Sequence, residues 1–322
     1  MPVKDADPYL SDCLDSILNQ SYENWELIAV DDHSSDQSLA LLRRYERSNT
    51  RIKILANQGN GIVSALQLAY SNSKGDLIHR MDADDKMPPE KLKGLNAAWM
   101  PGNVVTGKVE YFSDEWLVGL GFQNYQNWLN GLMESGNHWK DIYMECPIPS
   151  PAWLIHRDDF DKCGAFDSEL IPEDYDLCFR WYKHGIGIIA LDEVVHLWRD
   201  SQKRTSRKNP SYFPMAYYPL KVHHFLSIDR DKKKPLILWG AGKKGKLISK
   251  LLNDKSVEYE WVTDNQKKWG VEINGKIISP RGDDISGRQL IIAIASPEDK
   301  RELKNQLKRN HHTADTDIWW FC

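Results

Sequence analysis

The stretch with the strongest chemical signal is residues 77–85, which begin apolar and end in three carboxylates, Asp82, Asp84 and Asp85. Carboxylates spaced this closely repel one another, so we expect a positive group among them. A hard divalent cation at the end of a strand, shared with phosphate oxygens, has the chemistry that such a turn would hold. The same residues would also form a solvated acidic turn that caps the helix opened by the following Pro-Pro pair.

A second acidic pair, Asp31 and Asp32, follows an apolar run. The periodicity of this region predicts strands at 25–30 and 51–55 that alternate with helices at about 8–19, 37–48 and 62–73. Such alternation indicates parallel βαβ units, whose strands end at one edge of the sheet. Open α/β sheets bind their ligands at that edge. We therefore expect one acidic cluster to bind the base or ribose of a nucleotide and the other to hold a metal and a diphosphate.

Glu173 and Asp174 form a third acidic pair at the start of a helical pattern. The helix dipole favours acids at this position, so capping explains them. A carboxylate held in a cleft would also serve as a general base toward a hydroxyl group. Farther on, Arg199, Arg204 and Arg207 are candidates to hold a diphosphate, because arginine matches phosphate geometry. A solvated basic loop explains these arginines at least as well.

Four segments carry a resemblance to a known family. They are residues 2–6 (Pro-Val-Lys-Asp-Ala), 14–21 (Leu-Asp-Ser-Ile-Leu-Asn-Gln-Ser), 30–36 (Val-Asp-Asp-His-Ser-Ser-Asp) and 80–85 (Arg-Met-Asp-Ala-Asp-Asp). In this order and spacing they resemble the family 2 glycosyltransferases with a GT-A fold, over about residues 1–225. The resemblance implies an inverting transferase that uses a nucleotide-sugar donor and Mg²⁺ or Mn²⁺. It further implies a saccharide or lipid-linked acceptor in surface polysaccharide assembly.

The same resemblance implies roles for individual residues. Asp31 would bind the edge of the base, Asp82 the ribose or the metal, and Asp84 the metal. Asp174 would be the general base, with Glu173 as its neighbour. The residues expected in the donor site are Pro2, Asp31, Asp32, Arg80, Asp82, Arg199 and Arg204, and those expected at the metal are Asp82, Asp84 and Asp85. Acceptor contacts are expected in the aromatic stretch 111–150 and around 150–153.

The start of the chain departs from the family pattern. Family members normally have an apolar strand before the Pro-Val turn, whereas this chain begins at Met1-Pro2. We therefore expect the first strand of the sheet to be missing, through a misassigned start codon or truncation. A missing central strand would leave backbone groups unpaired in a buried sheet, with lower stability and impaired donor binding.

The C-terminal region carries a separate motif. A charged linker at 229–234 divides a GT-A domain at 1–228 from a smaller Rossmann-like α/β domain at 235–322. A short apolar strand runs into Gly240, Gly242 and Gly245, and a second strand ends at Asp264. This is the context of a dinucleotide-binding fingerprint. The region is short and shows no separate set of residues for hydride chemistry, so NAD binding, a structural role and an oligomerising role all stay open.

Three functions are therefore weighed. The leading one is a metal-dependent glycosyltransferase, because three acidic sites lie in order on a βαβ scaffold. The second is an NAD(P)-dependent oxidoreductase or epimerase run by the C-terminal domain, which depends on one glycine loop. The third is a non-catalytic nucleotide-sugar binder, suggested by the missing strand.

Composition limits the alternatives. The chain has 322 residues, of which 41% are hydrophobic and 27% charged, with a net charge of −4, which disfavours a nucleic-acid partner. Its five cysteines show no CxxC spacing, so we expect reduced thiols of a cytoplasmic protein, with neither disulfides nor a zinc site. No apolar run approaches the roughly 20 residues that span a bilayer, and no signal peptide is visible. Peripheral association with the inner face of the membrane and homo-oligomerisation stay open.

Overall fold

The computed structural model describes residues 1–168, 170–202, 204, 207, 209–210, 213–282, 285–309 and 317–322. The chain forms two compact units. The first comprises Met1–Trp139 and Pro147–Lys208, and the second comprises Lys140–Cys146 and Asn209–Cys322. Residues 140–146 and 209–228, which the sequence prediction placed in the first domain, thus group with the second unit.

The first unit begins with a parallel βαβ region, as the alternation of strands and helices predicted. Its sheet has the order β1-β2-β3 and is parallel throughout. The strands are β1 (Pro2–Val3), β2 (Leu27–Asp31) and β3 (Ile52–Ala56), and the helices are α1 (Leu10–Leu18), α2 (Ser38–Ser48) and α3 (Gly61–Ser71).

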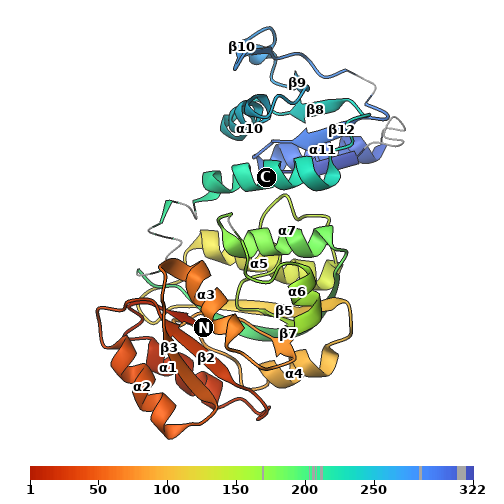
Figure 1. Cartoon of the computed structure of the whole chain (residues 1–322). Helices are drawn as coiled ribbons and strands as arrows, with labels where there is room; N and C mark the ends of the chain where they lie inside the picture. Colours follow the sequence, from red (N-terminus) through yellow and green to blue (C-terminus); the bar gives the residue numbers. More distant parts are fainter. Residues whose placement is uncertain are drawn as a thin grey trace. The chain divides into compact units, whose positions relative to one another are not determined.

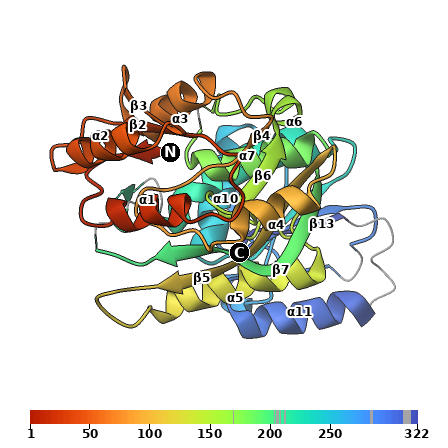
Figure 2. The same ribbon diagram turned by 90° about the horizontal axis from the view of Figure 1, so that it is seen from below.

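Strand β2 is buried along its whole length because helices cover both of its faces. Leu27 and Ala29 pack in a cluster with residues of α1 and α2. Ile28 and Val30 pack on the other face against Ala65 and other residues of α3. Figure 2 shows α1 and α3 on opposite sides of β2. This two-sided burial explains why residues 27–30 of β2 are all apolar and do not alternate with polar residues.

At the place of the first strand, which was expected to be missing, the structure has a strand of two residues, β1. Pro2 pairs with Val30 and Val3 pairs with Asp31, which makes β1 a two-residue strand in the sheet. The Met1 amine donates a hydrogen bond to Ile28 O at 2.8 Å, and Val30 N donates to Met1 O at 2.9 Å. The carboxyl end of β2 is therefore paired where unpaired backbone was expected.

A second, mixed sheet completes the first unit, with the order β4-β6-β5-β7. Strand β6 is antiparallel to both of its neighbours, and β5 is parallel to β7. Figures 1 and 2 show β5 and β7 side by side. The strands are β4 (Leu77–Ile78), β5 (Asn103–Phe112), β6 (Trp153–His156) and β7 (Gly187–Arg199), and the helices are α4 (Lys91–Ala98), α5 (Leu120–Ser135), α6 (Arg157–Lys162) and α7 (Glu173–Lys183).

The second unit contains a parallel sheet of order β13-β12-β8-β9. Chain order reverses next to β8, as in doubly wound α/β sheets. The sheet strands are β8 (Leu236–Trp239), β9 (Glu260–Val262), β12 (Gln289–Ile292) and β13 (Asp317–Trp320). The helices are α9 (Tyr218–His224), α10 (Lys243–Asp254) and α11 (Pro297–Arg309). Shorter elements are η2 (Pro214–Tyr217), η3 (Phe225–Asp229), η4 (Gln266–Lys268), β10 (Glu272–Ile273) and β11 (Lys276–Ile277). No helix within the described ranges is both long and apolar enough to cross a membrane.

Candidate active site

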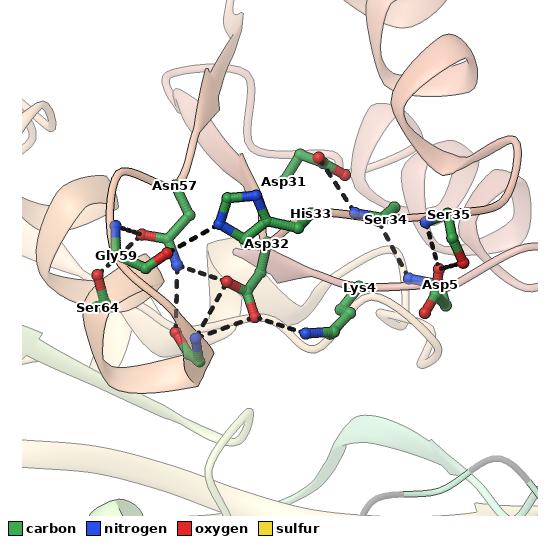
Figure 3. A network of polar contacts seen from close by, with 11 residues as sticks. Lys4, Asp5, Asp31, Asp32, His33, Ser34, Ser35, Asn57, Gly59 and Ser64 are labelled. Atoms are coloured by element: carbon green, nitrogen blue, oxygen red, sulfur yellow. Dashed lines mark hydrogen bonds and ion pairs between the residues drawn. The ribbon is translucent and has the colours of Figure 1, made fainter.

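The carboxyl end of β2 carries Asp31 and Asp32, whose side chains point away from each other (Figure 3). Asp32 accepts hydrogen bonds from Asn57 Nδ2 at 2.6 Å and from Gly61 N at 3.1 Å, and it pairs with Lys4 Nζ at 3.4 Å. Burial by itself would raise the pKa of Asp32, but the hydrogen bonds from Asn57 and Gly61 outweigh it and hold that pKa below its usual value. Asp32 thus ties together the loops that follow β1, β2 and β3.

Asp31 has one carboxylate oxygen that no described residue satisfies. Its side chain is buried, and Oδ2 accepts a hydrogen bond from Ser34 N at 3.4 Å. Oδ1 is buried and has no hydrogen-bond partner among the described residues. Leaving a buried acceptor unpaired costs about 1–3 kcal/mol. A ligand N–H at this position would remove that cost, which fits the expected contact with the edge of a base.

Arg80 joins the acidic turn after β4 to the start of α7. It is 5% exposed and donates from Nε to Asp82 Oδ1 at 3.1 Å and from its terminal nitrogen to Glu173 Oε1 at 3.0 Å. Burial disfavours the charged guanidinium, but Asp82 and Glu173 raise the pKa of Arg80 above its ordinary value. The second and third acidic clusters therefore meet through one buried cation. Because both arms of Arg80 are engaged, its place in the predicted donor site is that of a link between carboxylates.

The remaining two acids of the turn differ in their surroundings. Asp85 is 1% exposed, and its oxygens accept from Arg199 N at 2.8 Å and lie 2.9 Å from His196 Nε2. Burial and the neighbouring Asp82 raise the pKa of Asp85 to about 7. Burial and the carboxylates of Asp85 and Asp82 raise the pKa of Asp84 to about 7 as well. A cation bound here would relieve this repulsion, as the sequence predicted.

The acidic turn could supply only some of the ligands of a metal ion. No group of three His, Cys, Asp or Glu side chains in the described part of the chain is placed to hold a metal ion. Asp85 is committed to His196 and to the backbone of β7, which leaves Asp84 and Asp82 as the carboxylates that fit a divalent cation. The other positions around such a cation would need oxygens from a phosphate or water.

Asp85 belongs to a buried network of polar side chains that includes His196 and Lys91. Lys91 Nζ lies 3.2 Å from His196 Nδ1 and donates to Pro151 O at 2.5 Å. Lys91, His196 and Asp85 are each at most 2% exposed. Burial lowers the pKa of Lys91 to about 7 and lowers the pKa of His196. His196 therefore serves the packing of β7 against the acidic turn and is not available to a phosphate.

We expect Asp85→Ala to lower the free energy of unfolding by about 3 kcal/mol, because it leaves His196 and the Arg199 amide buried without their acceptor. Chemical denaturation at pH 7 measures the change. Asp192→Ala removes a carboxylate that is 85% exposed and should change stability by less than about 0.5 kcal/mol. Equal stability of the two variants would show that the buried network contributes nothing.

Two further arginines predicted in the donor site, Arg199 and Arg204, interact with the acidic turn. Arg199 is 1% exposed, donates to Asp84 O at 2.7 Å and to Asp12 Oδ2 at 3.0 Å, and pairs with Asp114. These contacts give it a structural role. The Arg204 guanidinium lies 4.6 Å from the Trp198 ring. Burial would lower the pKa of Arg204, yet Tyr111 and the carboxylates of the acidic turn raise it. Arg204 Nη1 also donates to Arg199 O at 3.2 Å, and a contact of Arg204 with a diphosphate stays a prediction.

Asp174 lies in the first turn of α7, beside Glu173. Its Oδ2 accepts a hydrogen bond from Ser150 Oγ at 2.5 Å, and its Oδ1 accepts from Tyr175 N at 2.8 Å. Burial and the Glu173 carboxylate raise the pKa of Asp174 to about 6, against the opposing charge of Arg80. A carboxylate with this pKa is ionised near neutral pH and is basic enough to accept a proton.

Other expected site residues lie elsewhere. Trp153, near which acceptor contacts were expected, is 2% exposed and packs on Phe160 and Trp181 in the core. Sequence reasoning missed Asn57 and Lys91. Asn57 comes two residues after the predicted strand 51–55, so its position near a strand end was a usable signal. Lys91 offered none, because it has the form of an ordinary helical surface lysine.

The glycine loop of the second unit is explained by packing. Gly240 has φ +118°, and a Cβ there would lie 2.9 Å from the Ala293 backbone. A Cβ on Gly245 would meet Gly240 O at 1.9 Å, whereas a Cβ on Gly242 would meet nothing within 4 Å. Asp264 Oδ2 accepts from Trp239 Nε1 at 2.8 Å. Packing thus accounts for the first and third glycines and for the aspartate, and dinucleotide binding stays an open prediction.

The first unit has the architecture of GT-A glycosyltransferases, and comparison with solved structures supports this. TarS of S. aureus (residues 1–349, in complex with UDP-GlcNAc) superimposes with a TM-score of 0.55 at 17% identity, covering 78% of this chain and 70% of that one. The mannosyltransferase PcManGT from Pyrobaculum calidifontis, in complex with GDP-Man and Mn²⁺, gives 0.53 at 18% identity, covering 73% and 64%. At these identities the likeness shows the fold.

The sequence defines the family. Residues 1–164 match the model of glycosyl transferase family 2, so the chain belongs to this family. Among curated relatives, the O-antigen biosynthesis glycosyltransferase WbnJ of Escherichia coli is 28% identical over 232 residues, covering 69% of this chain and 86% of the relative. The putative teichuronic acid biosynthesis glycosyltransferase TuaG of Bacillus subtilis is 33% identical over 93 residues, covering 29% and 37%. The chain spans less than half the length of several of its curated relatives.

Proposed function

We propose that this protein transfers a sugar from a nucleotide-sugar donor to a hydroxyl of a saccharide or lipid-linked acceptor, with inversion at the anomeric carbon. The observation that carries the proposal is the double ion pair of Arg80, which holds the acidic turn and the start of α7 against each other. This link supports a mechanism in which the diphosphate binds next to the general base. The relatives in O-antigen and teichuronic acid synthesis support surface polysaccharide assembly as the setting.

Each of these residues has a separate role in a single displacement reaction at the anomeric carbon. Asp31 Oδ1 accepts a hydrogen bond from the base, and Arg204 neutralises charge on the leaving diphosphate. Asp174 removes the proton of the acceptor hydroxyl as its oxygen bonds to the anomeric carbon and the bond to the diphosphate breaks. Ser150 holds the Asp174 carboxylate in place. A divalent cation held by Asp84 and Asp82 would supply further charge stabilisation to the diphosphate.

The pH profile should report Asp174. The base acts when ionised, so kcat/KM should rise with pH through about 6 and then level off. Ser150 donates to the ionised form and lowers the pKa of Asp174, so Ser150→Ala should move the rise to higher pH. We expect activity to fall about fivefold at pH 6 and less at pH 8.5. Ser150→Thr keeps the hydroxyl and should keep the profile. An equal loss at both pH values would contradict this role of Ser150.

Donor binding can be tested without knowing the acceptor. UDP-, GDP- and dTDP-sugars are added with Mn²⁺, and the melting temperature of the whole chain is measured. A donor at about 100 times its Kd stabilises by about 2.7 kcal/mol, a shift of several degrees. Asp31→Ala should weaken this shift, whereas Asp158→Ala, which removes a carboxylate that is 89% exposed, should not. If none of the sugar nucleotides raises the melting temperature, the proposal fails. Binding without turnover would favour a non-catalytic binder.

A further inference from the structure

A pocket of about 530 Å³ lies in the first unit, between α3 and the residues at the end of α6. Its described lining comes from residues 57–71 and 161–167, which belong to one compact unit. The volume falls within the range of about 300–1,000 Å³ that is usual for small-molecule sites. The carboxylates assigned above to the donor, the metal and the proton transfer are not among its lining residues. The pocket is therefore separate from the candidate active site.

Hydrogen bonds hold the two walls of this pocket together. Tyr70 Oη donates to Asp161 Oδ1 at 2.5 Å, and Gln67 Nε2 donates to Asp167 Oδ1 at 3.1 Å. The ring of Tyr70 also lies edge-on to the ring of Phe166, with centroids 6.0 Å apart. Because the walls are already fixed to each other, a ligand would bind with little cost for ordering them.

The lining offers hydrogen-bond acceptors, an amide and carbon surface. Asp161 and Asp167 are exposed, and each uses one carboxylate oxygen in the bonds between the walls. An ionised carboxylate only accepts hydrogen bonds, so the ligand must bring donors. The exposed amide of Gln58 both donates and accepts. Leu68 and Phe166 add apolar surface, and the described lining contains no lysine, arginine or histidine.

These groups discriminate among classes of ligand. Two carboxylates without a cation in the described lining repel phosphates, nucleotides and uronic acids. A metal ion is disfavoured as well, because the described residues contain no group of three acidic, His or Cys side chains placed to hold one. A wholly apolar ligand would cover the carboxylates and amides without bonding to them. A neutral saccharide has hydroxyls that donate and accept, and a carbon face that packs on an aromatic ring, so it fits every part of the lining.

One part of the pocket is connected to the candidate donor site. Asn57 and Ser64 both line the pocket. Asn57 Oδ1 accepts a hydrogen bond from Ser64 Oγ at 2.8 Å, and Asn57 Nδ2 donates to Asp32 Oδ1 at 2.6 Å (Figure 3). A test of the pocket must therefore leave Asn57 unchanged. Ser71 also lines the pocket and lies seven residues after Ser64 on α3, which is about 10 Å along the helix.

We propose that this pocket binds a short neutral saccharide, whose ring packs on Phe166 and whose hydroxyls bond to Gln58, Asp161 and Asp167. The site goes beyond the proposed function, because it holds a saccharide without taking part in transfer. In an enzyme that extends a saccharide, it would hold a part of the acceptor or product away from the reacting end. That use rests on the proposed function, whereas the binding itself does not.

The test measures retention of the full chain on an array of neutral and uronic-acid oligosaccharides, without a nucleotide and without Mn²⁺. We expect neutral oligosaccharides to retain it, and those with uronic acids to retain it less at low salt. Ser71→Trp places a large ring in the pocket and should lower the affinity for the best-retained oligosaccharide at least about tenfold in calorimetric titration. Gln58→Ala should lower it about fivefold, the effect of one hydrogen bond.

Ser48→Trp is the matched control. Ser48 and Ser71 are the last residues of α2 and α3, and both are exposed. Each donates from its hydroxyl to the carbonyl three residues earlier, at 2.9 Å and 3.1 Å. Of the two, Ser71 alone lines the pocket. Ser48→Trp should therefore bind the oligosaccharide as the wild type does, and both variants should keep the melting temperature within about 2 °C.

Several outcomes would overturn the proposal. Equal affinity of Ser71→Trp and Ser48→Trp would place the saccharide elsewhere. Retention by no oligosaccharide, or only by those with uronic acids, would contradict the expected ligand class. Loss of retention in Asp174→Asn but not in Ser71→Trp would assign the saccharide to the active site. A failure of the proposed function would appear separately, as the absence of any shift of the melting temperature with sugar nucleotides.

Discussion

Replacing Asp174 with asparagine is expected to lower kcat by about 10³-fold, with little change in the melting temperature. Asparagine is close in shape and can still bond to Ser150 and to the Tyr175 amide, but it cannot accept the proton of the acceptor. General bases contribute about 10²- to 10⁴-fold to rate. Single-turnover transfer from saturating donor measures the chemical step. The KM for the donor should stay within about threefold, because Asp174 acts on the acceptor side.

Two comparison variants separate this role from a structural one. Asp158→Asn changes an exposed carboxylate and should keep full kcat. Glu173→Gln weakens the ion pair with Arg80 and should lower stability as well as kcat, since Glu173 is 6% exposed and holds α7 to the acidic turn. If Asp174→Asn transfers sugar at the wild-type rate, the base is another residue. A loss that comes with unfolding would leave only a structural role.

Much of the fold was predictable because the burial of a strand or helix determines which of its residues are apolar. The run at 25–30 is apolar at nearly every position, and in the structure β2 is covered by helices on both faces. The helices at 8–19, 37–48 and 62–73 are found within a few residues of their predicted ends. The antiparallel β6 was not predicted. It pairs with strands about 50 and 75 residues earlier in the chain, and nothing local to 153–156 encodes those partners.

The carboxylates of the candidate site could be predicted from the sequence, whereas the roles of its arginines and lysines could not be predicted as well. Asp31, Asp82 and Asp174 lie at the ends of predicted strands or helices. Residues at such ends often line a crevice, so their position in the sequence was informative. Arg199 has the composition of a phosphate ligand, yet Asp12 and Asp114 enclose it. These partners lie far away in sequence, so the type of side chain alone could not show that its charge is already matched.

The glycine loop is a second case in which the sequence motif alone did not reveal the role of its residues. Its spacing is that of a dinucleotide fingerprint, but Gly245 is required by the closeness of Gly240 O, and Asp264 is bonded to Trp239. A tight strand-to-helix turn needs these glycines whether or not a phosphate binds. The same glycine spacing is therefore found whether the glycines are needed for a tight turn or for binding a ligand, and the sequence does not distinguish the two cases.

Replacing Asp84 with alanine is expected to lower kcat/KM by about 10²- to 10³-fold and to abolish the dependence of nucleoside diphosphate binding on Mn²⁺. The surroundings single out this carboxylate. Asp85 is held by His196 and the Arg199 amide, and Asp82 by Arg80. Asp84 is raised in pKa by burial and by both neighbours, so it gains most from a cation. Calorimetric titration of a nucleoside diphosphate with and without Mn²⁺ measures the coupling.

The comparison with Asp82→Ala and with excess EDTA decides where the metal lies. Wild-type turnover in excess EDTA would contradict metal dependence itself. Unchanged Mn²⁺ coupling in Asp84→Ala, with coupling lost in Asp82→Ala, would move the metal to Asp82. We expect the opposite order, because Asp82 already pairs with the Arg80 guanidinium at 3.1 Å and would bind a cation only by sharing that partner. Removing Asp82 also frees one arm of Arg80, so its effect should include a loss of stability that Asp84→Ala does not show.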